Sequence, residues 1–128
     1  MRGNRSAGTL KFDSATPKIY VEVDPAIVSL ARALLPQPLK SQLKPQRYPP
    51  HISVVRNEPL SNYLHDGDPI RFLYDPEPVV GDVYAWLRVL SPDLIRLRRD
   101  LGLPDSSEWS RPPNGEECFH ITIGNRKS

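Results

Sequence analysis

The chain has 128 residues, 15 prolines, one cysteine and a formal net charge of +2. This length predicts a single domain with its own core, and one cysteine excludes an internal disulfide. The charge is too small for a protein that tracks a long nucleic acid, and it suits a compact anionic ligand better. Because no apolar run approaches the roughly 20 residues of a membrane span, we expect no membrane partner and a cytoplasmic location.

The N-terminal residues 1–8 are polar and predict a flexible tail, so the folded domain is expected over residues 9–128. Beyond this tail, runs of alternating apolar and polar residues predict strands, most clearly at residues 18–23. In chain order, strands are expected at residues 9–12, 18–23, 51–56, 70–74, 79–90 with an interruption near Gly81, and 118–124.

Two helices are predicted, one in each half of the chain. Asp24-Pro25 and Ser91-Pro92 each place a capping side chain just before a proline at the first helical position. Pro36 is expected to end the first helix and Gly102 the second. The second helix is expected to turn its leucines inward and to expose a charged face that contains Arg96, Arg98 and Arg99.

Two long loops complete the chain, and each leads directly into a strand. Residues 37–50 are rich in proline and basic, and residues 105–117 are polar and contain Trp109. Long loops in a compact domain are often functional, which draws attention to the two strands that follow them.

These two strands carry the same short pattern, His51-Ile52-Ser53-Val54 and His120-Ile121-Thr122-Ile123. Since successive side chains on a strand point to opposite faces, the histidine and the hydroxyl of each copy share one face, opposite the apolar residues. If the two strands lie close together, two imidazoles and two hydroxyls meet in one cleft. That set suits phosphodiester chemistry, with one histidine as base, the other as acid, and Ser53 and Thr122 binding phosphate oxygens.

The paired His-x-Ser/Thr pattern, with 120 − 51 = 69 residues between the histidines, resembles the 2H phosphoesterase superfamily. Further segments resemble one branch of it, the phage anti-CBASS cyclic-oligonucleotide phosphodiesterases; they are residues 11–13 with 17–20, 48–56 and 119–124. The resemblance implies an α+β fold with two pseudo-symmetric antiparallel-sheet lobes, helices outside and the active cleft between the lobes.

The resemblance also implies a function in immune evasion. The chain would be a metal-independent hydrolase, a phosphodiesterase that degrades cyclic di- or trinucleotide signals such as cyclic GMP-AMP in the cytosol of an infected host cell. The same motifs would serve an RNA-end 2′,3′-cyclic phosphodiesterase, and a non-catalytic sponge would bind the cyclic nucleotide without cutting it. The presence of both histidines and both hydroxyls argues against the sponge, because binding alone does not need two titratable groups.

No metal and no cofactor are predicted. A cluster of His65, Asp66 and Asp68, or Cys118 with the two motif histidines, offers an alternative metal site, but neither spacing matches a standard site. Three aromatic residues are candidates for stacking on substrate bases, with a purely structural role as the alternative for each: Tyr20, Trp86 and Trp109. The sequence leaves open which histidine is the acid, which bases are preferred and whether the chain oligomerises.

Overall fold

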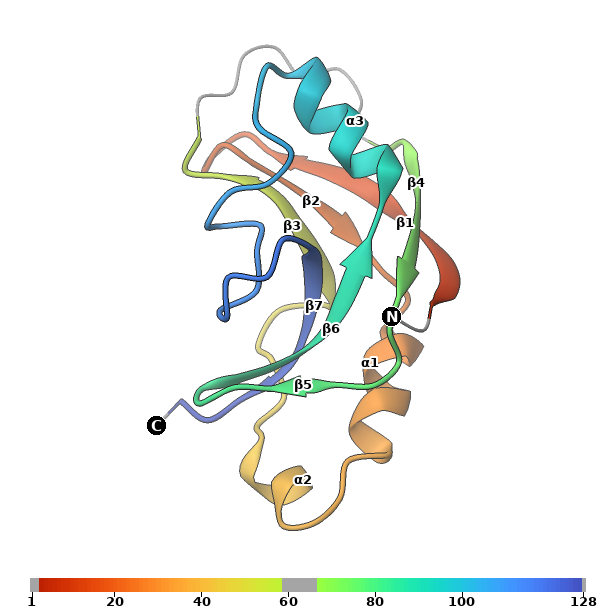
Figure 1. Cartoon of the computed structure of the whole chain (residues 1–128), viewed down its shortest axis with the longest axis vertical. Helices are drawn as coiled ribbons and strands as arrows, with labels where there is room; N and C mark the ends of the chain where they lie inside the picture. The colour runs from red at the N-terminus through yellow and green to blue at the C-terminus, as the bar shows by residue number, and fades with distance from the viewer. Residues whose placement is uncertain (1–2, 59–66, 128) are drawn as a thin grey trace.

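A computed structural model describes residues 3–58 and 67–127 (Figure 1). Seven strands form one antiparallel sheet in the order β4-β1-β2-β3-β7-β6-β5, and a further pairing of β4 with β6 closes six of them into a barrel. The prediction of an α+β fold is confirmed. The strands are β1 (Asn4–Asp13), β2 (Lys18–Glu22), β3 (His51–Arg56), β4 (Pro69–Tyr74), β5 (Val79–Val80), β6 (Tyr84–Leu90) and β7 (Phe119–Asn125).

Both predicted helices are present, as α1 (Pro25–Ala33) and α3 (Pro92–Asp100). The Asp24 side chain accepts a hydrogen bond from the backbone N–H of Ala26, and the Ser91 hydroxyl accepts one from Leu94, so both predicted caps form. A short helix, α2 (Leu39–Gln42), interrupts the segment that was predicted to be a loop. Among the described residues, no helix is both long and apolar enough to cross a membrane.

The prediction of a flexible tail is wrong for residues 4–8, which form the first half of β1. Asn4 to Gly8 pair with β4 in an antiparallel ladder that runs from Tyr74 to Ile70. Their side chains are mostly exposed, which explains why the sequence here is polar. Backbone hydrogen bonds to β4, and not buried side chains, hold this part of the strand in place.

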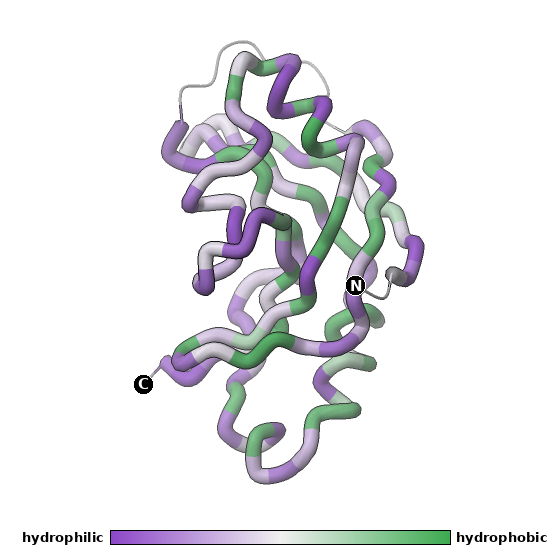
Figure 2. Tube along the Cα trace, viewed as in Figure 1, coloured by the Kyte–Doolittle hydropathy of each residue, from purple (hydrophilic) through white to green (hydrophobic). Residues whose placement is uncertain are grey.

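The apolar faces of the two motif strands line the inside of the barrel, as predicted. Ile52, Val54, Ile121 and Ile123 are fully buried, and they belong to one core cluster with apolar side chains from all six barrel strands. Figure 2 shows hydrophobic and paler residues alternating along the strands. The histidines and hydroxyls of the motifs therefore lie on the outer face of the barrel wall.

At two places in the barrel wall, neighbouring strands are joined by only one or two registered residue pairs, and we call these places seams. One registered residue pair, Ile52 with Ile121, joins β3 to β7, and two pairs join β4 to β6, whereas six pairs join β1 to β4. The helices lie toward opposite ends of the molecule, with α3 against β3 and β4 and α1 against β7 (Figure 1). The motif residues are thus carried by the two strands that meet at one seam.

Candidate active site

The register of β3 and β7 brings the four motif residues into one square array. Because the strands are antiparallel and Ile52 pairs with Ile121, His51 lies across from Thr122 and Ser53 lies across from His120. Directly opposed side chains have Cβ atoms about 5 Å apart, while diagonal neighbours are about 7–8 Å apart. This register puts each imidazole beside a hydroxyl of the other motif, and the two imidazoles on one diagonal of the array.

Both imidazoles are held by a backbone carbonyl at the same ring nitrogen. The Nδ1 atom of His51 lies 2.9 Å from the carbonyl oxygen of Pro49, and Nδ1 of His120 lies 3.2 Å from that of Ser110. A carbonyl oxygen can only accept a hydrogen bond, so Nδ1 carries the proton in both rings. In the neutral rings this leaves Nε2 with a free lone pair, which is the atom that a general base needs.

The surroundings of His120 favour its neutral form. Burial lowers the pKa of His120 to about 4, the Ser110 carbonyl acts in the opposite direction, and the nearby imidazole of His51 lowers the pKa further. The effect of His51 on His120 also indicates that the two rings lie close enough to interact electrostatically. At neutral pH, His120 is therefore an unprotonated imidazole.

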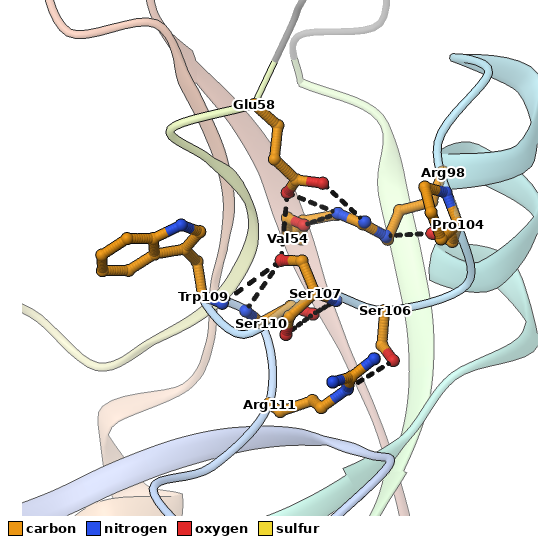
Figure 3. Close-up of polar contacts among 9 residues, drawn as sticks. All are labelled: Val54, Glu58, Arg98, Pro104, Ser106, Ser107, Trp109, Ser110 and Arg111. Carbon is orange, nitrogen blue, oxygen red and sulfur yellow. Dashed lines mark hydrogen bonds and ion pairs between the residues drawn. The ribbon is translucent and has the colours of Figure 1, made fainter. Parts of the chain in front are cut away.

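The loop before β7 orients His120, and a hydrogen-bonded network holds that loop (Figure 3). The Ser107 hydroxyl donates to Glu58 at 3.1 Å and accepts hydrogen bonds from the backbone N–H groups of Trp109 and Ser110, at 3.3 Å each. The Ser110 hydroxyl is bonded in turn to the backbone of Ser107. The result is a rigid turn that presents the Ser110 carbonyl to His120.

A buried ion pair anchors this network to the barrel. Arg98 binds both carboxylate oxygens of Glu58, at 2.7 and 2.8 Å, and also donates to the carbonyls of Val54 and Pro104. Although burial opposes ionisation, the hydrogen bonds and charge of Arg98 keep the pKa of Glu58 below its usual value. The expectation that Arg98 lies on a solvated face is wrong, because its side chain is fully buried.

His51 has a different setting, beside an open cavity. Tyr20 on β2 packs edge-on against the His51 ring, with 5.8 Å between the ring centroids. On its other side, His51 and Thr122 form part of the wall of a cavity of about 430 Å³. Segments of α1 and of the loop before β3 complete that wall, which includes Ser29, Gln46 and Tyr48.

The three aromatic residues predicted to bind bases have different positions. Tyr20 is partly exposed at the rim of the array, in register with Ser53. Trp109 is 42% exposed in the loop that orients His120, with the Arg56 guanidinium 5.6 Å from its ring centroid. Trp86 is only 1% exposed, because the turn around Gly81 covers its ring, so the prediction that it stacks on a base is wrong for this conformation.

The described part of the chain contains no cluster of three His, Cys, Asp or Glu side chains that could hold a metal ion. Burial raises the pKa of the Cys118 thiol to about 11, so a thiolate ligand is disfavoured at that position. The alternative site at residues 65–68 is not assessed by the structure, since His65 and Asp66 lie outside the described residues.

Several residues of the site could not be recognised from the motifs. Arg88 pairs with His120 across β6 and β7 and so shares its face of the sheet. Its guanidinium is bound by Asp75 at 2.7 Å and by Glu116 at 3.5 Å, which neutralise its charge locally. The carbonyls of Pro49 and Ser110 leave no trace in a sequence pattern, because any residue supplies a carbonyl.

Comparisons with protein-family models, with curated proteins and with solved structures give no significant match. Membership of the 2H phosphoesterase superfamily therefore stays a prediction from the paired motifs.

Proposed function

We propose that this protein is a metal-independent phosphodiesterase in which His51 and His120 act as an acid–base pair. One observation supports this most strongly. Two imidazoles and two hydroxyls occupy the corners of one array, and each ring is fixed by a backbone carbonyl at Nδ1, which leaves Nε2 for the substrate. A set of unrelated strand histidines has no reason to show this matched arrangement.

The different settings of the two histidines assign their roles. His120, with its pKa lowered to about 4, is the base, because it is unprotonated at neutral pH. His51 is then the acid, which gives a proton to the leaving oxygen. A base and an acid on opposite sides of a phosphate are suited to in-line displacement, in which one oxygen attacks as the other leaves.

The reaction can be written with every proton placed. Nε2 of His120 takes the proton of a ribose 2′-hydroxyl, whose oxygen attacks the adjacent phosphorus. The bond from phosphorus to the 5′-oxygen breaks, and His51 gives its proton to that oxygen. The products are a 2′,3′-cyclic phosphate and a free 5′-hydroxyl, and water opens the cyclic phosphate in a second step with the roles of the histidines reversed.

The hydroxyls of Ser53 and Thr122 donate hydrogen bonds to the non-bridging phosphate oxygens as charge builds on them. Arg88, which is in register with His120 on the neighbouring strand, is already paired with Asp75 and Glu116. The hydroxyls of Ser53 and Thr122 are therefore the main phosphate-binding groups in this proposal.

The preferred substrate is a cyclic di- or trinucleotide with 3′–5′ linkages, such as cyclic GMP-AMP, by resemblance to the phage anti-CBASS branch. The narrow β3–β7 seam supports the two-lobe plan of that family, since a single registered pair joins the strand that carries His51 to the strand that carries His120. On this proposal the substrate lies over the seam, between one lobe built on β1 to β4 and another built on β5 to β7.

The test is product analysis by mass spectrometry. Purified protein in excess EDTA is incubated with cyclic GMP-AMP, a cyclic trinucleotide and 2′,3′-cyclic mononucleotides. We expect linear products from the cyclic oligonucleotides, because the proposed mechanism uses two histidines and no metal ion. If every substrate is recovered intact, the proposal of an enzyme is wrong. If activity returns only when Zn²⁺ or Mn²⁺ is added, the metal-independent mechanism is wrong. If only the mononucleotides are opened, the RNA-end function is the correct one.

A further inference from the structure

The cavity beside His51 is lined by groups that suit a nucleobase. It has a volume of about 430 Å³, within the range of about 300–1,000 Å³ typical of small-molecule sites. Its walls come from α1, from the proline-rich segment before β3 and from β7. We will refer to it as the Tyr48 cavity, after the aromatic residue in its wall.

The Tyr48 cavity is continuous with the proposed reaction site. His51 and Thr122, which face each other across the β3–β7 seam, both belong to its lining. A phosphate held between the two imidazoles would therefore have its attached group at the mouth of this cavity. Neither Ser53 nor His120 contributes to the lining, so the cavity extends from one side of the array only.

The cavity lining contains one guanidinium, and backbone carbonyls hold it in place. The one guanidinium in the lining, that of Arg32, donates to the backbone carbonyls of Ile123 and Leu43, both at 2.8 Å. Gly124 has no side chain to obstruct this reach, since a Cβ there would lie 2.7 Å from Nη1 of Arg32. Backbone carbonyls carry no formal charge, so these two bonds orient the Arg32 guanidinium and leave its positive charge in the cavity wall.

The remaining groups match an aromatic ring with polar edges. Tyr48 is 69% exposed, which leaves its ring available to stack on a base, and three prolines add flat apolar surface. The Oε1 atom of Gln46 accepts a hydrogen bond from Asn125, and this orients the Gln46 amide and leaves its NH₂ group as a donor. The Ser29 hydroxyl supplies a further donor and acceptor.

We propose that the Tyr48 cavity binds the nucleobase on one side of the scissile phosphodiester, with Tyr48 stacking on the base and Gln46 and Ser29 contacting its edge. This inference rests on the proposed function. It makes residues 29, 46 and 48 determinants of base specificity, and it adds a stacking residue that replaces the buried Trp86.

The first experiment measures binding without turnover. Guanosine, adenosine and inorganic phosphate are titrated separately into ¹⁵N-labelled protein, and backbone amide shifts are followed. We expect a nucleoside to shift the amides of Ser29, Gln46 and Tyr48 in a saturable way, and phosphate to shift those of His51 and Thr122 instead. The proposal would be overturned if phosphate, and not the nucleosides, shifted the amide signals of Gln46 and Tyr48. It would also be overturned if the nucleosides shifted none of the three amide signals.

The second experiment measures kinetics with cyclic GMP-AMP. Tyr48→Ala should raise KM roughly tenfold, the scale of a lost base–aromatic stack, with kcat nearly unchanged, while Tyr48→Phe should retain the wild-type KM. Leu34→Ala, which removes an 82% exposed side chain outside the cavity, is the matched control and should change neither constant. An unchanged KM in Tyr48→Ala would overturn the proposal.

The two proposals fail in different ways. If nucleosides bind at the Tyr48 cavity but no phosphodiester is cut, the cavity assignment stands and the enzymatic function fails. If cleavage is robust while Tyr48→Ala and the nucleoside titration have no effect, the function stands and the cavity assignment fails.

Discussion

The two halves of the proposed active site carry the same residues on differently supported backbones. His120 donates its Nδ1 hydrogen bond to a serine-rich turn that a buried Glu58–Arg98 ion pair holds against the barrel. His51 donates its Nδ1 hydrogen bond to the carbonyl of Pro49, in a proline-rich segment that borders an open cavity. Two chemically identical side chains therefore lie in different surroundings, and this difference is the basis of the proposed division into base and acid.

The largest expected effect is on turnover. His51→Ala and His120→Ala should each lower kcat about 10²–10⁴-fold, because each removes one partner of an acid–base pair. Steady-state kinetics on cyclic GMP-AMP, with circular dichroism to verify folding, is the measurement. Near-wild-type turnover in either folded variant would show that the substituted histidine is not needed, and would contradict the acid–base pair.

Breaking the anchor of the His120 half should destabilise the protein. Arg98→Met leaves Glu58 without its buried partner and should lower the free energy of unfolding by about 3 kcal/mol. Arg99→Met on the same helix is the matched control, since Arg99 pairs with Asp105 in solvent, and it should leave stability close to wild type. Urea denaturation of both variants measures the contrast, and equal losses would contradict the anchoring role of Arg98.

The low pKa of His120 makes the stability of this half depend on pH. An unfolded chain protonates a histidine near pH 6.5, whereas folded His120 does so near pH 4, so the unfolded state binds more protons between these values. The wild type should therefore lose about 3 kcal/mol of stability relative to His120→Gln as the pH falls from 7 to 4. A difference between the two proteins that does not change with pH would show that His120 titrates normally.

The hydroxyls should have the smallest effects, and equal ones. Ser53→Ala and Thr122→Val each remove one donor to the phosphate and should lower kcat/KM about tenfold, since a hydrogen bond to a charged group contributes about 1.5–3 kcal/mol and the other donor remains. Kinetics on the two variants compares the halves directly. A large loss from one substitution and none from the other would show that a single hydroxyl binds the phosphate.

The sequence predicted much of the fold because local rules determine it. Alternation placed the motif histidines opposite a buried isoleucine face, and Asp24 and Ser91 marked both main helix starts. Their caps are local interactions, bonding the backbone N–H two or three residues ahead. The closure of six strands into one barrel was missed, since β1 meets β4 across more than 50 residues, and no local pattern reports such a pairing.

The supporting residues of the site were missed for two reasons. Arg98 follows Leu94 by four residues and precedes Leu101 by three, so it lies in the inward stripe of α3, and this spacing was a usable signal. The Tyr48 cavity had no such signal, because it forms where α1, the segment before β3 and β7 come together. A cavity of this kind depends on tertiary packing alone.

The central claim, that His51 and His120 work as one unit, is tested most directly by combining their substitutions. The measurement is kcat/KM on cyclic GMP-AMP for His51→Ala, His120→Ala and the double variant, all in EDTA. Because groups that act together lose their whole contribution when either is removed, we predict that the double variant is about as active as the weaker single variant. Losses that multiply in the double variant would show two independent roles and would contradict the account.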